Sequence, residues 1–116
     1  MLRTDLQKPP RGTARARKRD GYRCRWPLCD CQQRGDRIEV AHLRSKSLGG
    51  ENESSNMMCL CSSRHRGLPS LHSGELKIRP IDEALGTNGP CEFWASDSGD
   101  WHLVARERSV GLLETE

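Results

Sequence analysis

Three histidines and one asparagine stand at spacings that would let them meet around one divalent cation. His42 ends an expected strand, Asn56 precedes a short apolar run, and His65 and His72 follow it. Neutral imidazole nitrogens are good ligands for zinc, nickel or manganese, and an open coordination position can stabilise a phosphate and a leaving oxygen. A free imidazole can take a proton from water, and an asparagine carbonyl can orient it by accepting its other N–H.

Local signals place these residues on short elements of a small α+β fold. At 116 residues with an apolar share of 34%, the chain fits one domain with a thin core. Thr13 is the expected N-cap of a helix that ends near Arg19, 29–36 is an expected polar turn, and 37–41 alternates like a strand. Three more strands, separated by turn-forming residues, are expected at 75–81, 91–95 and 101–105.

Six cysteines, most of them at short spacings, favour bound metal over disulfides. The first ten residues contain no apolar leader segment, so we expect the chain to stay in the cytoplasm, where thiols are reduced. No apolar run approaches the roughly 18 residues that a membrane span needs. Cys91 and the three tryptophans are expected to pack in the core rather than to contact nucleobases.

The charge is unevenly spread along the chain. Residues 1–26 carry nine basic and two acidic side chains, whereas residues 73–116 carry four basic and nine acidic ones. This asymmetry predicts that the basic end faces a polyanion such as nucleic acid; the alternative is a solvated basic arm. The charged terminus from Glu107 onward is expected to fray. The candidate phosphate contacts in the basic region are Arg15, Arg17, Lys18 and Arg19.

Taken together, these pieces resemble the HNH (His-Asn-His) endonucleases, and the small phage and prophage members look closest. The resemblance covers residues 17–74, about half of the chain. Any one of its pieces is weak alone, but their order and spacing make the match fairly specific. The pieces are Arg19-Asp20-Gly21-Tyr22-Arg23-Cys24, Cys29, Glu39-Val40-Ala41-His42, Gly49-Gly50, Asn56, Leu60-Cys61 and His65.

The resemblance implies a ββα-metal core at 13–74, with 1–12 as a flexible basic arm and 75–116 as a β-rich extension of the same domain. Such an enzyme hydrolyses DNA phosphodiester bonds with a single Mg²⁺, Mn²⁺ or Ni²⁺ ion. His42 matches the general base, Asn56 the residue that orients it, and His65 a metal ligand; His72 is placed to be a further ligand. Further backbone contacts to DNA are expected from Arg44, Lys46, Arg64 and Arg66.

The resemblance also implies a structural zinc ion held by cysteines from both sides of the first strand. Cys24, Cys29 and Cys61 are the best-placed ligands, and Cys31 or Cys59 would supply the fourth thiolate. Four thiolates would tie the N-terminal turn to the start of the following helix and offset the thin core. The family's usual cysteine before the last histidine is replaced here by Arg64.

A second departure concerns the position before the general base, where the family has a metal-binding Asp or His and this chain has Ala41. Glu39 is expected to point to the opposite face from His42, so His72 and water are the favoured substitutes. The alternative interpretation is a non-catalytic, zinc-stapled nucleic-acid-binding module derived from the same scaffold. Membership of this family would also allow a link to phage packaging machinery; the DNA target, nicking or double-strand cutting, and the oligomeric state stay open.

Overall fold

A computed structural model describes residues 12–44 and 53–114 of the chain. Its helical segments are α2 (Thr13–Arg19), α3 (Cys31–Arg34), η2 (Ser54–Asn56), α4 (Ser62–Arg66) and η3 (Gly86–Asn88). Its strands are β1 (Ile38–His42), β2 (Met57–Cys61), β3 (Leu76–Pro80), β4 (Cys91–Asp97), β5 (Asp100–Ser109) and β6 (Leu112–Leu113). The mixed α+β class predicted from the sequence is therefore confirmed.

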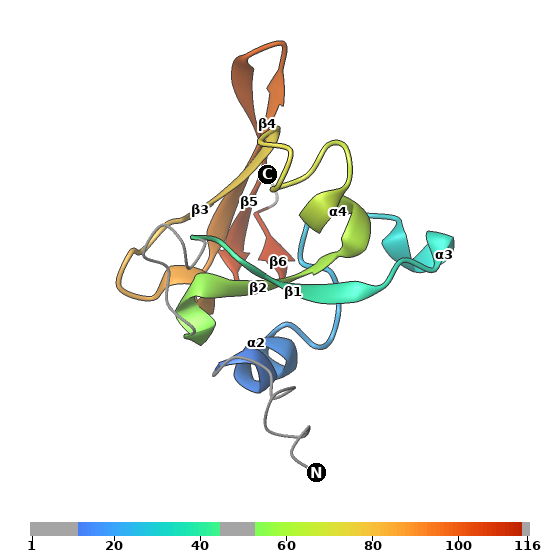
Figure 1. Cartoon of the computed structure of the whole chain (residues 1–116). Helices are drawn as coiled ribbons and strands as arrows, with labels where there is room; N and C mark the ends of the chain where they lie inside the picture. Colours follow the sequence, from blue (N-terminus) through green and yellow to red (C-terminus); the bar gives the residue numbers. More distant parts are fainter. Residues whose placement is uncertain (1–11, 45–52, 115–116) are drawn as a thin grey trace.

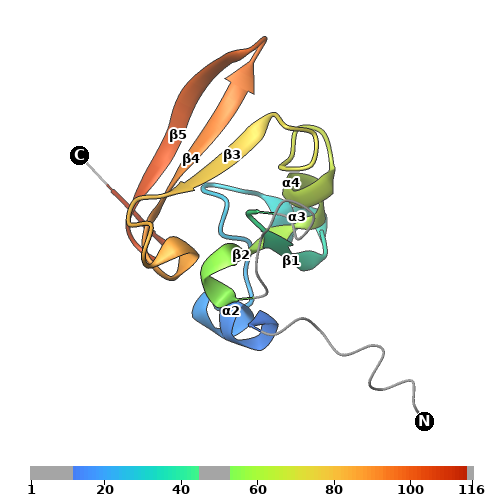
Figure 2. The ribbon, with the colours of Figure 1, turned by 60° about the vertical axis from the view of Figure 1, so that its left-hand side comes forward.

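The strands form two antiparallel sheets. β1 pairs with β2, with His42 opposite Met57 and Ile38 opposite Cys61. The second sheet has the order β3-β4-β5-β6. Figures 1 and 2 show α2 and this larger sheet on opposite sides of β1 and β2, and the far end of the β4–β5 hairpin extends away from the rest of the fold. Within the described ranges, the helices are too short and too polar to cross a membrane.

Helix α2 has the bounds that its sequence predicts, but its cap differs. Gly12 is the N-cap, with φ of 93°, so Thr13 begins the helix rather than capping it. The left-handed conformation at Gly12 suits a residue without a Cβ. Thr13 and Ala16 are buried one turn apart, while Arg15 and Arg17 are exposed. The helix therefore turns a face of small side chains inward and a basic face to solvent.

Strand β2 is buried along its whole length, which is why its sequence does not alternate. On one side, Cys59 Sγ lies 4.0 Å from the carbonyl oxygen of Ala16 in α2. On the other, Met58 and Leu60 belong to a cluster shared with the larger sheet. The segment 29–36, expected as a turn, contains the short helix α3, because Gly35 in the left-handed conformation gives it a helical C-cap.

One apolar cluster joins both sheets. The Trp26 and Phe93 rings meet edge to face, with centroids 5.3 Å apart. Edge-to-face packing aligns the positive ring edge of one residue with the negative face of the other. Cys91 is buried, as predicted. The buried members of the cluster are Trp26, Ala41, Met58, Leu60, Leu76, Ile78, Cys91 and Phe93.

A buried ion pair ties the segment 20–30, which joins α2 to α3 and which we call the N-terminal ribbon, to the last strands. Arg25 Nε and Nη2 donate to the two carboxylate oxygens of Glu107 at 3.0 and 2.8 Å, and Nη1 donates to Asp20 at 3.2 Å. The remaining oxygen lone pairs of Glu107 accept from the backbone N–H groups of Cys91 and Gly111. Glu107 is only 1% exposed, so the expectation of a frayed terminus from this residue is wrong.

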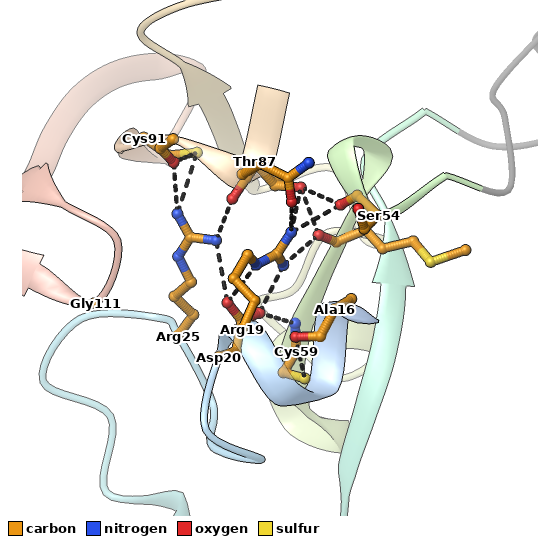
Figure 3. A network of polar contacts seen from close by, with 12 residues as sticks. Ala16, Arg19, Asp20, Arg25, Ser54, Cys59, Thr87, Cys91 and Gly111 are labelled. Atoms are coloured by element: carbon orange, nitrogen blue, oxygen red, sulfur yellow. Dashed lines mark hydrogen bonds and ion pairs between the residues drawn. The ribbon is translucent and has the colours of Figure 1, made fainter. Parts of the chain in front are cut away.

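Arg19 belongs to the same network, which Figure 3 shows. Its Nε and Nη2 donate to Asp20, Nη2 also donates to the Met57 carbonyl, and Nη1 donates to Ser54, Thr87 and Asn88. These bonds join α2 to both η2 and η3. The prediction that Arg19 contacts a DNA phosphate is corrected, because each nitrogen of its guanidinium already donates within the protein.

Replacing Arg25 by methionine should lower the free energy of unfolding by about 3–5 kcal/mol, because Glu107 would keep a buried charge without its partner. Urea denaturation followed by circular dichroism measures this change. Arg34→Met is the matched control, since Arg34 pairs with Asp30 and Asp36 at the surface and its loss should matter little. Equal losses in the two variants would contradict a dominant role for the buried pair.

Candidate functional site

Four cysteine sulfurs gather at one end of the β1–β2 pair. The Sγ atoms of Cys24, Cys29, Cys31 and Cys61 all lie within 4.8 Å of one another. The first two come from the ribbon after α2, Cys31 opens α3, and Cys61 ends β2. Four thiolates at this spacing could hold a metal ion such as zinc in tetrahedral coordination.

Of the two cysteines that the sequence left open for the fourth position, Cys31 is the one that lies in the cluster. Cys59 packs against α2 instead and is fully buried. Burial raises the pKa of the Cys59 thiol to about 11, and the nearby Asp20 carboxylate acts in the same direction. A thiol that resists ionisation is a small apolar side chain rather than a metal ligand.

The cysteine cluster itself favours a thiolate at Cys29. Burial alone would raise the pKa of that thiol, but hydrogen bonds from the Cys31 backbone and from the Cys61, Cys31 and Arg64 side chains lower it to about 7. The same surroundings raise the pKa of Cys31 to about 11, chiefly through burial. The backbone N–H of Arg64 donates to Cys61 Sγ at 3.4 Å. A bound cation would extend ionisation to all four thiols.

The structure brings His65 and His72 together beside β1. Their ring centroids are 4.7 Å apart, with the planes at 69°. His65 Nδ1 lies 2.8 Å from Glu39 Oε1, and Arg66 Nε donates to the same oxygen at 3.1 Å. Burial is the main reason why the pKa of His65 is lowered, with His72 adding to the effect and Glu39 opposing it.

Glu39 is a functional candidate that the sequence analysis assigned to the opposite face of the strand from His42. Its strand position was taken to point it away from the candidate metal, but α4 folds back over β1 and meets it there. A carboxylate on Nδ1 of a histidine holds the ring so that Nε2 can ligate a metal. Glu39 lies two residues before Ala41 in β1. Its charge was the signal that could have suggested this role.

His42 is the last residue of β1. The residues that follow His42 are held by Asn56: its backbone oxygen accepts from Leu43 N–H at 2.8 Å, and its side-chain amide makes two 2.9 Å bonds to the backbone of Arg44. Asn56 therefore fixes the chain on the C-terminal side of His42.

Two surface hollows meet at His42. One, of about 300 Å³, is lined by His42 together with Thr13, Arg17 and Arg37. The other, of about 310 Å³, is lined by His42 together with His72, Arg44 and Lys77. Cations from α2, from β3 and from both ends of β1 thus border His42, which shares one of the hollows with His72. Arg37 and Lys77 were not among the residues that the sequence singled out.

The remaining predicted phosphate contacts differ in their surroundings. Arg15, Arg17, Lys18, Arg44 and Arg66 are exposed, and Arg66 is bonded to Glu39. Arg64 is half-buried next to the cysteine cluster. Lys46 lies outside the described residues, as do Gly49-Gly50 and the basic arm 1–11. Ala41 is fully buried in the apolar cluster, where its methyl group offers no ligand.

No family model, no curated protein and no solved structure matches this chain.

The purified protein should contain about one zinc ion per chain, and a strong chelator should lower its melting temperature. Cys24→Ser should lose the zinc and melt at a lower temperature, because three thiolates and water hold the ion more weakly. Cys59→Ala is the matched control and should keep the zinc. Elemental analysis and thermal unfolding check both points; zinc loss in the control with retention in Cys24→Ser would contradict this ligand set.

Proposed function

We propose that the protein is a metal-dependent HNH endonuclease that hydrolyses DNA phosphodiester bonds. The observation that carries the proposal is the grouping of His42, His65 and His72. Two of these rings adjoin each other, and the third shares a hollow with His72. His42 from β1 and His72 from the loop after α4 thus line one hollow, and His65 from α4 adjoins His72.

The contacts of His65 and His72 suit the binding of a catalytic divalent cation. Glu39 on Nδ1 of His65 is the arrangement by which proteins orient a metal-binding imidazole. His65 and His72 would hold the cation, with water and phosphate oxygens completing its shell. When bound, Mg²⁺, Mn²⁺ or Ni²⁺ supplies positive charge that stabilises the scissile phosphate and the leaving 3′ oxygen.

The chain's own residues would divide the remaining work. His42 takes the proton from the attacking water, since a neutral imidazole nitrogen can accept one. Asn56 keeps the backbone beyond His42 in place. Arg17, Arg37 and Arg44 border the hollows and would position the DNA backbone without reading its sequence. The cysteine-bound zinc is structural, and we place the enzyme in the cytoplasm with its DNA.

His42→Ala should slow the nicking of supercoiled plasmid in Mg²⁺, Mn²⁺ or Ni²⁺ by at least about 100-fold, the usual contribution of a general base. Agarose gels of relaxed and linear products follow the reaction. His102→Ala is the matched control, because His102 is an exposed histidine on β5. If both variants nick like the wild-type protein, His42 is not the base; if the wild-type protein never nicks, the nuclease proposal fails.

Glu39→Gln should weaken Mn²⁺ binding by about 10–100-fold, since the amide cannot hold His65 through a charged hydrogen bond. Isothermal titration of the chain with Mn²⁺ measures this without any cleavage. Glu92→Gln, which removes a carboxylate on the larger sheet, is the control and should bind Mn²⁺ normally. Unchanged binding in Glu39→Gln would show that Glu39 and His65 do not belong to a metal site.

A second candidate function is nucleic-acid binding without catalysis. Ala41 favours it, because the resembled family has a metal ligand at this position. Ala41 instead lies fully buried in the apolar cluster. An Asp placed there would carry a buried charge, so restoring the ligand would cost stability. DNA binding that depends on salt, with no nicking in any divalent cation, is the result that would select this function.

A further inference from the structure

The outer face of the larger sheet carries aromatic, apolar and cationic side chains together. Alternation along β3 puts Leu76 and Ile78 into the core and leaves Lys77 and Arg79 on the other face. The register places Trp94 between Lys77 and Leu103, and Trp101 is two residues from Leu103 on the same face. We call the surface made by Lys77, Arg79, Trp94, Trp101 and Leu103 the tryptophan face.

Two of its large side chains are open to solvent. Trp101 is 41% exposed and Leu103 45% exposed, whereas Trp26 in the core is 7% exposed. The expectation that all three tryptophans pack inside the fold is therefore wrong for Trp101. Exposed aromatic and aliphatic side chains side by side mark a contact surface more often than a single exposed residue does.

A cation already sits over the exposed indole ring. Lys77 Nζ lies 4.5 Å from the centroid of the Trp101 ring. Acidic groups also lie near the ring. Glu92 is on the same face, where it accepts from Trp94 Nε1 and lies 3.8 Å from Arg106, and the exposed Asp100 precedes Trp101 in the chain, whereas Glu75 accepts from Ser73 Oγ. The face therefore offers an aromatic plane with cations next to it, which suits a ligand of alternating flat rings and negative charges.

The tryptophan face adjoins the candidate catalytic surface. Lys77, which covers Trp101, also lines the hollow shared by His42 and His72. β3 is the edge strand of its sheet on the side of α4, and the β4–β5 hairpin extends beyond it (Figure 2). A strand of nucleic acid held by the arginines around His42 would meet this face as it leaves the hollow.

We propose that the tryptophan face binds an unpaired stretch of nucleic acid by stacking a base on Trp101. The Lys77 ammonium would leave the ring and contact an adjacent phosphate. This inference rests on the nucleic-acid binding of the proposed function and adds to it the class of substrate, a strand with accessible bases. Double-stranded DNA would not supply the stacking contact, because its bases are covered by their neighbours.

Fluorescence anisotropy with the full-length His42→Ala chain and no added divalent cation measures binding without cleavage. One probe is a short labelled oligothymidylate, and the other is an abasic oligonucleotide of the same length and charge. The thymidylate should bind more tightly. Trp101→Ala should weaken its binding about tenfold and leave abasic binding unchanged, because only stacking is lost. Trp101→Phe, which keeps a stacking ring, should restore most of the difference.

Leu85→Ala is the matched control, since Leu85 is 46% exposed on a loop outside this face, and it should bind both probes normally. Equal affinity of the His42→Ala chain for the two probes would overturn the proposal. So would sedimentation showing concentration-dependent self-association that Leu103→Lys abolishes, because the face would then be a contact between copies. The nicking assay is separate: base-dependent binding without nicking sinks the nuclease proposal alone, and nicking without base-dependent binding sinks this one alone.

Discussion

The fold depends on the burial of one guanidinium group. Arg25 cannot leave water unless carboxylates and carbonyl oxygens surround it, and these come from the ribbon itself, η3 and β5. Asp20 and Glu107 are separated by most of the chain, so satisfying Arg25 fixes the N-terminal ribbon against the larger sheet. The ribbon carries Cys24 and Cys29, and the sheet carries Lys77. The same network therefore positions the cysteine cluster and the surface around His42.

The β1–β2 pair carries the cysteine cluster at one end and His42 at the other. At one end Ile38 faces Cys61, and the sulfur cluster can close the fold around a metal ion. At the other end His42 faces Met57, and Asn56 holds the chain that follows. A metal site with four thiolate ligands stabilises the fold. A site built from a few imidazoles would keep coordination positions open for reaction. In the function that we propose, dividing these roles would let the histidine site remain exposed and incompletely coordinated without destabilising a small core.

Only part of the acidic character of the last third of the sequence reaches the surface: Asp82, Asp97 and Asp100 are exposed, whereas three glutamates have partners within the fold. Glu107 is internal, Glu92 is bonded to Trp94, and Glu75 is bonded to Ser73. The cations of β3 are left on the surface, Lys77 over an aromatic ring and Arg79 exposed. Net charge by segment is thus a poor guide to which face a polyanion would meet, since it ignores which charges neutralise each other inside the fold.

The sequence by itself determined the features that depend only on residues close together in the chain. The helix from Thr13 to Arg19, the strand ending at His42 and the three later strands follow from local periodicity and turn residues. The cysteine spacing indicated a metal cluster but could not choose between Cys31 and Cys59, which lie equally close to the other ligands along the chain. Tertiary structure made that choice, and it also placed Glu39 against His65, buried Glu107 and enclosed Arg19. Each of these outcomes depends on contacts between residues far apart in sequence, because burying a charge requires partners that only the folded chain brings near.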